Sequence, residues 1–320
     1  MRRYVSWTVI GCLAAFIGCD DVIEDDITDD VITTVAPLDN AEINGNTVQF
    51  RWNGIEGANE YRLQVNNQAT NAIILDSVVD TSIFDYTMDP GNYQWRVRGE
   101  NFAYTTPYSF DSRFSVVAST NLEGQTVTLD NPTNNEYLND SEITFTWEAI
   151  STATFYKIKI SKVEENTETE IYDNNDNKIN GISITIGNSV ITEDGEYKWE
   201  IQAGNDTSET DYFSGTFFID TQEPPKPTLT APTTGETADA GEEITFTWTF
   251  EDTGVVQSGI TGTIQISENE NFNEVLNTVS NVSEYKFTFD NPGTYFWRVR
   301  GKDDAGTTGD YSDPFQIIIE

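Results

Sequence analysis

Short stretches in which apolar and polar residues alternate recur along the chain from about residue 34 onward. In TVQFRW, residues 47–52, the side chains of Val48, Phe50 and Trp52 would share one side of an extended segment. A period of two is typical of a β-strand with one face buried and the other in water. The pattern therefore predicts an all-β protein.

The strands repeat as a larger unit. Six tryptophans follow Trp7 and form three pairs; the first members are 95 and 101 residues apart and the second members 104 and 98. Each unit has a strand ending in Phe-x-Trp and, later, a turn followed by Tyr-x-Trp. About 100 residues is the usual size of a β-sandwich. We expect three tandem sandwiches, at 34–118, 119–221 and 222–320. Their predicted core residues are Trp52, Tyr61, Trp95, Trp147, Tyr156, Trp199, Trp248 and Trp297.

Two units contain nearly the same long stretch, PGNYQWRVRG at 90–99 and PGTYFWRVRG at 292–301. Alternation turns the tryptophan inward and the two arginines outward. The tryptophans are therefore assigned to the core rather than to a ligand platform. The arginines are expected to pair with carboxylates on neighbouring strands.

The arrangement of Trp52, Tyr61 and the run Tyr93-Trp95-Val97 resembles fibronectin type III and related immunoglobulin-like domains. The resemblance extends over 33–320 and implies the fold. It says little about function, because such scaffolds carry many unrelated binding sites.

The first residues have the pattern of a secretory signal. Arg2 and Arg3 precede a mostly apolar run of 13 residues, 5–17, which is too short to cross a bilayer. A short buried helix or an uncleaved anchor are the alternatives. AFIGC resembles a bacterial lipobox, although Phe16 stands where leucine is usual. That resemblance implies a signal peptide at 1–18 and a lipid anchor on Cys19.

The segment 19–33 is strongly acidic: seven of its fifteen residues are Asp or Glu and none is basic. It is expected to be a solvated, self-repelling tether. It also resembles the signal that exports certain lipoproteins to the cell surface, although in other lineages an Asp after the cysteine resembles an inner-membrane retention signal. The predicted location is the bacterial outer membrane, lipid-anchored and exposed at the cell surface.

Composition narrows the possible chemistry. The net charge is −37, from 17 basic and 54 acidic residues, which excludes nucleic acid as a partner. The chain has no histidine, and its two cysteines are Cys12 and Cys19. A serine triad and a thiolate metal site therefore lack essential residues. Glycoside hydrolysis needs two carboxylates at a suitable separation. With 54 acidic residues, some pair will always meet that distance, so such a pair would not indicate catalysis. We expect no enzymatic activity.

Loop differences between the units suggest two binding sites. Phe102, Tyr104 and Tyr108 could form a platform for a sugar or peptide, or could cover the end of the core. Asp252, Asp303 and Asp304 could share a calcium ion if their loops meet, or could belong to plain surface loops. No other cofactor is expected.

These features predict a non-enzymatic, lipid-anchored protein of the cell envelope whose sandwiches bind an unidentified extracellular or envelope protein or glycan. The alternative is a glycan-capture lipoprotein that works beside an outer-membrane importer.

Overall fold

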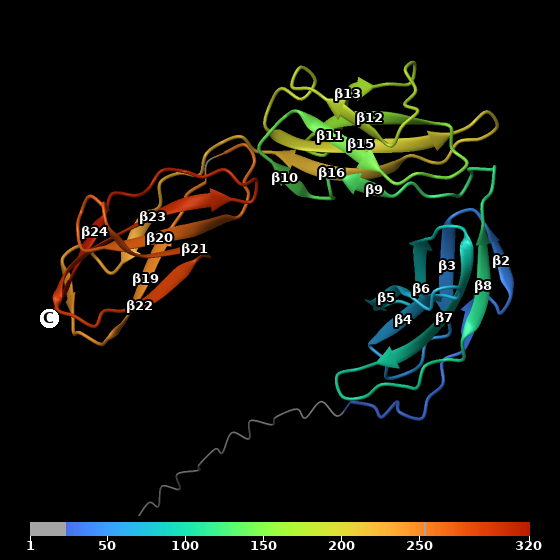
Figure 1. Cartoon of the computed structure of the whole chain (residues 1–320), viewed down its shortest axis with the longest axis horizontal. Helices are drawn as coiled ribbons and strands as arrows, with labels where there is room; N and C mark the ends of the chain where they lie inside the picture. The colour runs from blue at the N-terminus through green and yellow to red at the C-terminus, as the bar shows by residue number, and fades with distance from the viewer. Residues whose placement is uncertain (1–23, 253) are drawn as a thin grey trace, which may run out of the picture. The chain divides into compact units, whose positions relative to one another are not determined.

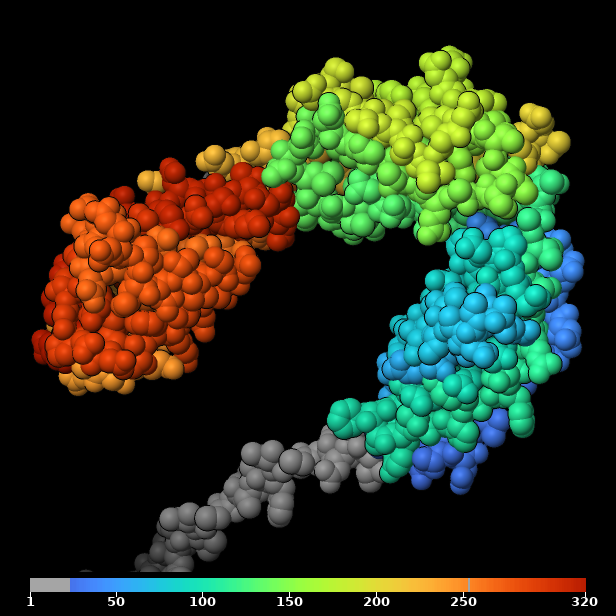
Figure 2. Space-filling model, viewed as in Figure 1, coloured from blue at the N-terminus to red at the C-terminus, as the bar shows by residue number. Residues whose placement is uncertain are grey.

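The computed structural model describes residues 24–252 and 254–320, which fold as β-strands joined by loops (Figure 1). The predicted signal peptide at 1–18 and the predicted lipid site Cys19 lie outside this range. No helix in the described part is long and apolar enough to span a membrane. The strands form three bodies of eight strands each, called sandwiches 1, 2 and 3. Figure 2 shows their surfaces, coloured by position along the chain. One compact unit holds most of sandwich 1, and a second holds sandwiches 2 and 3.

Sandwich 1 has one sheet of order β1-β3-β6 and one of order β2-β8-β7-β4-β5. Strand β7 pairs antiparallel with β4, with Trp95 opposite Val65 and Arg98 opposite Arg62. Strand β5 forms the edge of the larger sheet. The strand bounds are β1 Thr34–Ala36, β2 Ala41–Asn44, β3 Thr47–Trp52, β4 Glu60–Asn67, β5 Ile73–Val79, β6 Ile83–Thr87, β7 Gly91–Glu100 and β8 Ser112–Val117.

Sandwich 2 repeats this order, with sheets β14-β11-β9 and β10-β16-β15-β12-β13. Strand β10 pairs parallel with β16, and the remaining pairings are antiparallel. The strand bounds are β9 Leu129–Asn131, β10 Glu136–Leu138, β11 Ile143–Trp147, β12 Phe155–Glu164, β13 Thr167–Asp173, β14 Ser183–Ile186, β15 Gly195–Gly204 and β16 Phe213–Ile219.

Sandwich 3 has the same order again, with sheets β17-β19-β22 and β18-β24-β23-β20-β21. Its central strand β23 contains the second copy of the WRVRG sequence. The strand bounds are β17 Thr228–Ala231, β18 Glu236–Ala238, β19 Glu243–Thr249, β20 Ile260–Ser267, β21 Val275–Val282, β22 Glu284–Thr288, β23 Gly293–Asp303 and β24 Phe315–Ile319.

The core of each sandwich lies between its two sheets and is largely aromatic. In sandwich 1, Phe50 meets Trp95 edge-on with ring centroids 5.2 Å apart, and Trp52 meets Tyr61 at 5.5 Å. Edge-to-face contacts of this kind stabilise beyond simple burial. All eight predicted core residues are buried: Trp52, Tyr61, Trp95, Trp147, Tyr156, Trp199, Trp248 and Trp297.

Sandwich 3 differs from the other two beside its first tryptophan. Tyr61 accepts the backbone N–H of Ile55 through its hydroxyl, at 3.1 Å. Gly262 of β20 takes the place of Tyr61 in sandwich 3, because Gly262 lies opposite Gly301 just as Tyr61 lies opposite Gly99. A Cβ atom there would come within 2.5 Å of the Trp248 ring. The tyrosine is therefore absent because the indole ring takes its space.

The acidic segment before β1 is attached to sandwich 1. Ile27 and Ile32 are only 1% and 2% exposed, and Asn101 donates its side-chain N–H to the carbonyl of Asp25 at 2.9 Å. Burying two isoleucines offsets the entropy lost in ordering the segment. The free tether expected over 19–33 is therefore wrong for its described part, because Ile27 and Ile32 are buried against the domain.

Candidate functional site

The outward face of the larger sheet of sandwich 1 carries guanidinium groups stacked on a tyrosine. Arg96 lies over the Tyr108 ring at 4.2 Å from its centroid, and Arg98 lies at 5.0 Å. Arg96 also donates two hydrogen bonds to Gln64 Oε1, at 3.1 and 2.9 Å. Strand alternation places both cations on one face, and the loop after β7 brings Tyr108 over them. Stacking of this type contributes about 0.5–1 kcal/mol at an exposed site.

An ion-pair network surrounds the stack in sandwich 1. Glu100 accepts hydrogen bonds from Arg62 at 2.9 Å and from Arg98 at 2.7–2.8 Å, and Asp76 pairs with Arg62 at 3.0 Å. Burial raises the pKa of Glu100, but the hydrogen bonds from Arg98 and Arg62 outweigh burial and hold that pKa below its ordinary value. Arg98 is therefore neutralised by Glu100, which lies on its own strand β7, whereas Arg96 has no ion-pair partner among the described residues and bonds Gln64 instead. The predicted pairing with carboxylates on neighbouring strands is wrong for both arginines.

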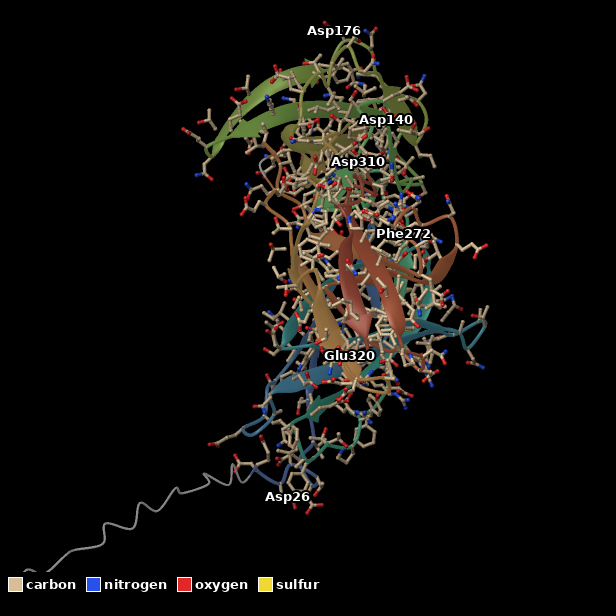
Figure 3. The ribbon with its side chains drawn as sticks, turned by 90° about the vertical axis from the view of Figure 1, so that its left-hand side faces the viewer. Asp26, Asp140, Asp176, Phe272, Asp310 and Glu320 are labelled. Atoms are coloured by element: carbon tan, nitrogen blue, oxygen red, sulfur yellow. The ribbon has the colours of Figure 1, made fainter. Side chains whose placement is uncertain are left out.

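Sandwich 3 keeps the stack and lacks the network. Arg298 and Arg300 lie 4.0 and 4.9 Å from the Tyr311 ring centroid. Arg298 also lies 4.1 Å from the ring of Phe272, labelled in Figure 3. The register puts Lys302 and Thr278 where sandwich 1 has Glu100 and Asp76.

Within residues 24–252 and 254–320, neither Arg298 nor Arg300 has an ion-pair partner, and the Nε of Arg300 is buried without a hydrogen bond. The prediction of carboxylate pairing therefore fails for this copy.

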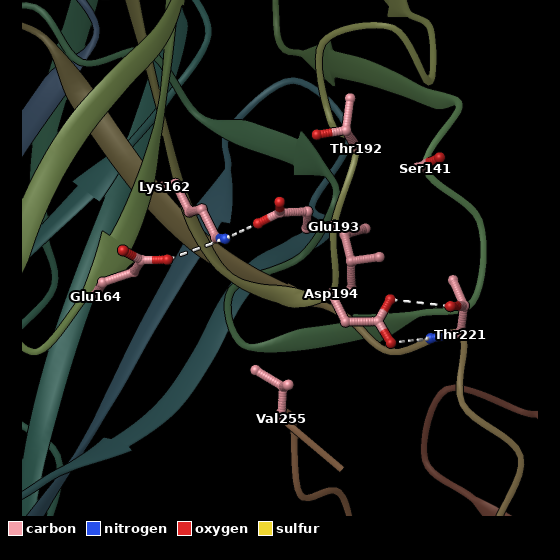
Figure 4. A pocket seen from close by; sticks show the side chains of 9 residues that line it. Ser141, Lys162, Glu164, Thr192, Glu193, Asp194, Thr221 and Val255 are labelled. Atoms are coloured by element: carbon pink, nitrogen blue, oxygen red, sulfur yellow. Dashed lines mark hydrogen bonds and ion pairs between the residues drawn. The ribbon is translucent and has the colours of Figure 1, made fainter.

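Sandwich 2 uses lysines on the same face. Lys198 pairs with Glu168 at 3.1 Å and with Glu200 at 3.2 Å. At one end of the sandwich a hollow is lined in part by Lys162, Glu193 and Asp194 (Figure 4). Lys162 lies between Glu193 and Glu164, and its hydrogen bonds to them raise its pKa. This cation is already satisfied by its neighbours and offers little to a ligand.

The three aromatic residues predicted as one platform lie in different settings. Phe102 is 96% exposed and Tyr104 is 36% exposed, whereas the ring of Tyr108 is covered by guanidinium groups. The shared platform of these three residues stays a prediction. Phe110, which is 90% exposed, was not predicted. The sequence could have indicated it, because residues in an extended segment alternate between the two faces, and Phe110 follows the buried Ser109.

The acidic residues proposed for calcium lie in loops at one end of sandwich 3. The N–H of Gly259 donates to Asp304 Oδ2 at 3.0 Å, which joins the two loops. Asp252 accepts the N–H of Gly254 at 2.9 Å. Asp303 is 7% exposed; one carboxylate oxygen accepts the N–H of Thr307, and the other has no hydrogen-bond partner.

Burial, together with the nearby charges of Asp220 and Asp304, raises the pKa of Asp303. Among the described residues no group of three or more acids, histidines or cysteines is arranged to hold a metal ion. Calcium binding by Asp252, Asp303 and Asp304 stays a prediction.

The strand order identifies the scaffold. In each unit a three-stranded sheet faces a five-stranded sheet. The central strand of the larger sheet carries Tyr-x-Trp: β7, β15 or β23. One of its neighbours is the strand after the first tryptophan (β4, β12 or β20), and the other is the last strand of the unit (β8, β16 or β24). Each unit is a fibronectin type III-like β-sandwich.

The chain is similar to solved structures at low sequence identity. No protein-family model and no curated protein sequence matches the chain. The FN1–FN3 domains of chicken CNTN1 are 16% identical, with 90% of this chain and 97% of that chain covered and a TM-score of 0.43. The fibronectin(III)-like modules of Clostridium thermocellum CbhA are 17% identical, with 61% and 94% covered and a TM-score of 0.37. The fold assignment therefore rests on the strand order.

Proposed function

We propose that this protein is a non-enzymatic, lipid-anchored component of the bacterial cell envelope whose fibronectin type III-like sandwiches bind a protein or glycan partner. The observation that carries the proposal is the repeated architecture: three sandwiches of the same eight-strand order follow a segment with the charge, apolar run and cysteine of a lipoprotein signal. Such modules are rigid supports whose loops and faces present binding residues.

The residues present support binding rather than catalysis. The chain has no histidine, and no cysteine after Cys19. In the described part of the chain, residues 34–319 form the strands of the three sandwiches and the loops between them, without an inserted domain. The strongest chemical features of the described surface are stacked cations and exposed aromatic rings, which are features of recognition.

The decisive experiment compares the wild-type protein with Cys19→Ala in fractionated cells. The wild type should partition with membranes and into detergent, and the variant should be released in soluble form. A variant that stays with the membrane contradicts the lipid anchor. Protease treatment of intact cells then distinguishes the cell surface, where the sandwiches are digested, from the periplasm, where they survive.

A second function, glycan capture beside an outer-membrane importer, is favoured by one observation. Phe102 and Phe110 present nearly complete ring surfaces to solvent, at 96% and 90% exposure. Flat apolar rings stack on sugar faces. The ring of Tyr108 already stacks on Arg96 and Arg98. Polysaccharide binding that is lost in Phe102→Ala or Phe110→Ala would support this function, and retention in both would exclude these rings.

A further inference from the structure

The turn after β7 of sandwich 1 holds two aromatic side chains in solvent. Asn101 Oδ1 accepts the backbone N–H groups of Ala103 and Tyr104, at 3.1 and 2.7 Å. The N–H of Asn101 closes the turn on the carbonyl of Tyr104 at 3.0 Å. This geometry fixes the backbone and turns Phe102 outward, where it is 96% exposed.

Sandwich 2 builds the same turn from polar residues. Asn205 Oδ1 accepts the N–H groups of Thr207 and Ser208, at 2.9 and 3.0 Å, and the N–H of Asn205 bonds the carbonyl of Ser208 at 3.0 Å. The sequences NFAY and NDTS therefore occupy one backbone conformation, with Asp206 in place of Phe102. The conformation of the turn does not require aromatic residues, so their presence in sandwich 1 needs a separate cause.

Both asparagines also hold the chain that enters their sandwich. Asn101 donates to the carbonyl of Asp25 at 2.9 Å, and Asn205 donates to the carbonyl of Thr120 at 2.9 Å. Two residues later each entering chain buries an apolar residue, Ile27 or Leu122. The chain entering sandwich 2 comes from sandwich 1, whereas the chain entering sandwich 1 comes from Cys19. The aromatic turn thus belongs to the sandwich that directly follows the cysteine.

Chain length limits the distance between this turn and the cysteine. Asp25 lies six positions after Cys19, and an extended chain of that length spans at most about 22 Å. Asp25 is hydrogen-bonded to the residue next to Phe102. If Cys19 carries the lipid, the turn is held close to the bilayer surface.

We propose that Phe102 and Tyr104 form a membrane-contact turn that inserts into the headgroup layer of the anchoring bilayer and sets the orientation of sandwich 1. The inference rests on the proposed lipid anchor at Cys19. Aromatic rings favour this layer because an apolar body and, in tyrosine, a polar hydroxyl match its gradient of polarity. The acidic residues Asp25 and Asp26 beside the turn disfavour anionic lipids, so a zwitterionic surface suits it best.

The test uses the lipid-modified full chain with one reporter thiol. Ala103→Cys places the thiol between the two rings, and Thr207→Cys places it at the matching exposed position of sandwich 2. Each carries an environment-sensitive fluorophore in phosphatidylcholine vesicles with brominated acyl chains. The label at 103 should show blue-shifted, bromine-quenched emission, and the label at 207 should show neither. The double change Phe102→Asp and Tyr104→Ser should abolish the response at 103.

The outcomes are separable. Vesicle-bound protein whose labels at 103 and 207 behave alike overturns the membrane-contact turn and leaves the lipid anchor intact. A label at 103 that responds to soluble polysaccharide but not to vesicles also overturns it, in favour of glycan binding. Protein that fails to sediment with vesicles, although folded and processed, refutes the lipid anchor itself. A response at 103 that survives the double change overturns the role of the two rings.

Discussion

Sandwiches 1 and 3 present almost the same central strand, yet their outward faces differ in charge. In sandwich 1 both arginines of WRVRG stack on Tyr108, Arg98 is neutralised by Glu100, and Asp76 binds the neighbouring Arg62. In sandwich 3 the stack on Tyr311 is present, and Lys302 and Thr278 replace the two acids. The stack is thus common to both scaffolds, whereas the carboxylate network belongs to one copy. A cation stacked on a ring retains part of its electrostatic stabilisation when its carboxylate is absent.

The largest expected effect removes what the two sandwiches share. Trp95→Ala and Trp297→Ala should each destabilise their own sandwich by about 3–5 kcal/mol, because both indoles are fully buried and a cavity would remain. Denaturant unfolding followed by the remaining tryptophans measures this. A folded variant of ordinary stability at either position would show that the two cores differ.

The next effect separates the two faces. Glu100→Gln should cost sandwich 1 about 1–3 kcal/mol, because Arg62 and Arg98 lose the negative charge of a mostly buried partner. The matched change Lys302→Glu puts an acid at the same place in sandwich 3 and should alter stability by about 1 kcal/mol or less. Thermal unfolding of both variants is the measurement. Equal losses would mean that the network has no special role in sandwich 1.

Acidification should act on the two sandwiches in opposite directions. The lowered pKa of Glu100 contributes stability at neutral pH, which is lost as pH falls through its folded-state pKa. The raised pKa of Asp303 has the reverse sign: its contribution is fully present below its unfolded-state pKa and lost as pH rises through its folded-state pKa. Glu100→Gln should flatten the first dependence and Asp303→Asn the second, in melting curves recorded across pH.

Asp303→Asn also tests calcium binding. Without divalent ions the variant should be more stable than wild type at neutral pH, by about 1 kcal/mol, since it removes a negative charge that burial and the neighbouring carboxylates disfavour. If Asp252, Asp303 and Asp304 bind calcium, the ion should raise the melting temperature of the wild type and leave the variant unchanged. A calcium response in both proteins would place the ion elsewhere.

The smallest effect concerns the tyrosine rings on which the arginines stack, Tyr108 and Tyr311. Tyr108→Phe and Tyr311→Phe should be nearly neutral, while Tyr108→Ala and Tyr311→Ala should each cost about 0.5–1 kcal/mol through loss of the cation–π contact. Arg298 keeps a second ring, Phe272, at 4.1 Å. The alanine change should therefore cost less in sandwich 3, and unfolding of the four variants gives that comparison.

Strand alternation and the tryptophan spacing predicted the all-β architecture, because a period of two and a buried indole depend only on local sequence. The turns after the Tyr-x-Trp strands were less predictable. Phe102 and Tyr108 are six residues apart and both aromatic, yet one is in water and the other stacks on two arginines. That distinction depends on how the loop after β7 folds back over the outward face of the strand, which the local pattern does not specify.

The sequence by itself determined the number of sandwiches, the inward tryptophans, the outward arginines and the acidic charge, since these follow from periodicity and composition. Only the tertiary structure decided which carboxylates reach the arginines, that Gly262 makes room for Trp248, and that Ile27 and Ile32 attach the acidic segment to sandwich 1. Each of these joins residues distant in the chain. Strand register and loop closure set such contacts, and neither is encoded in a local pattern.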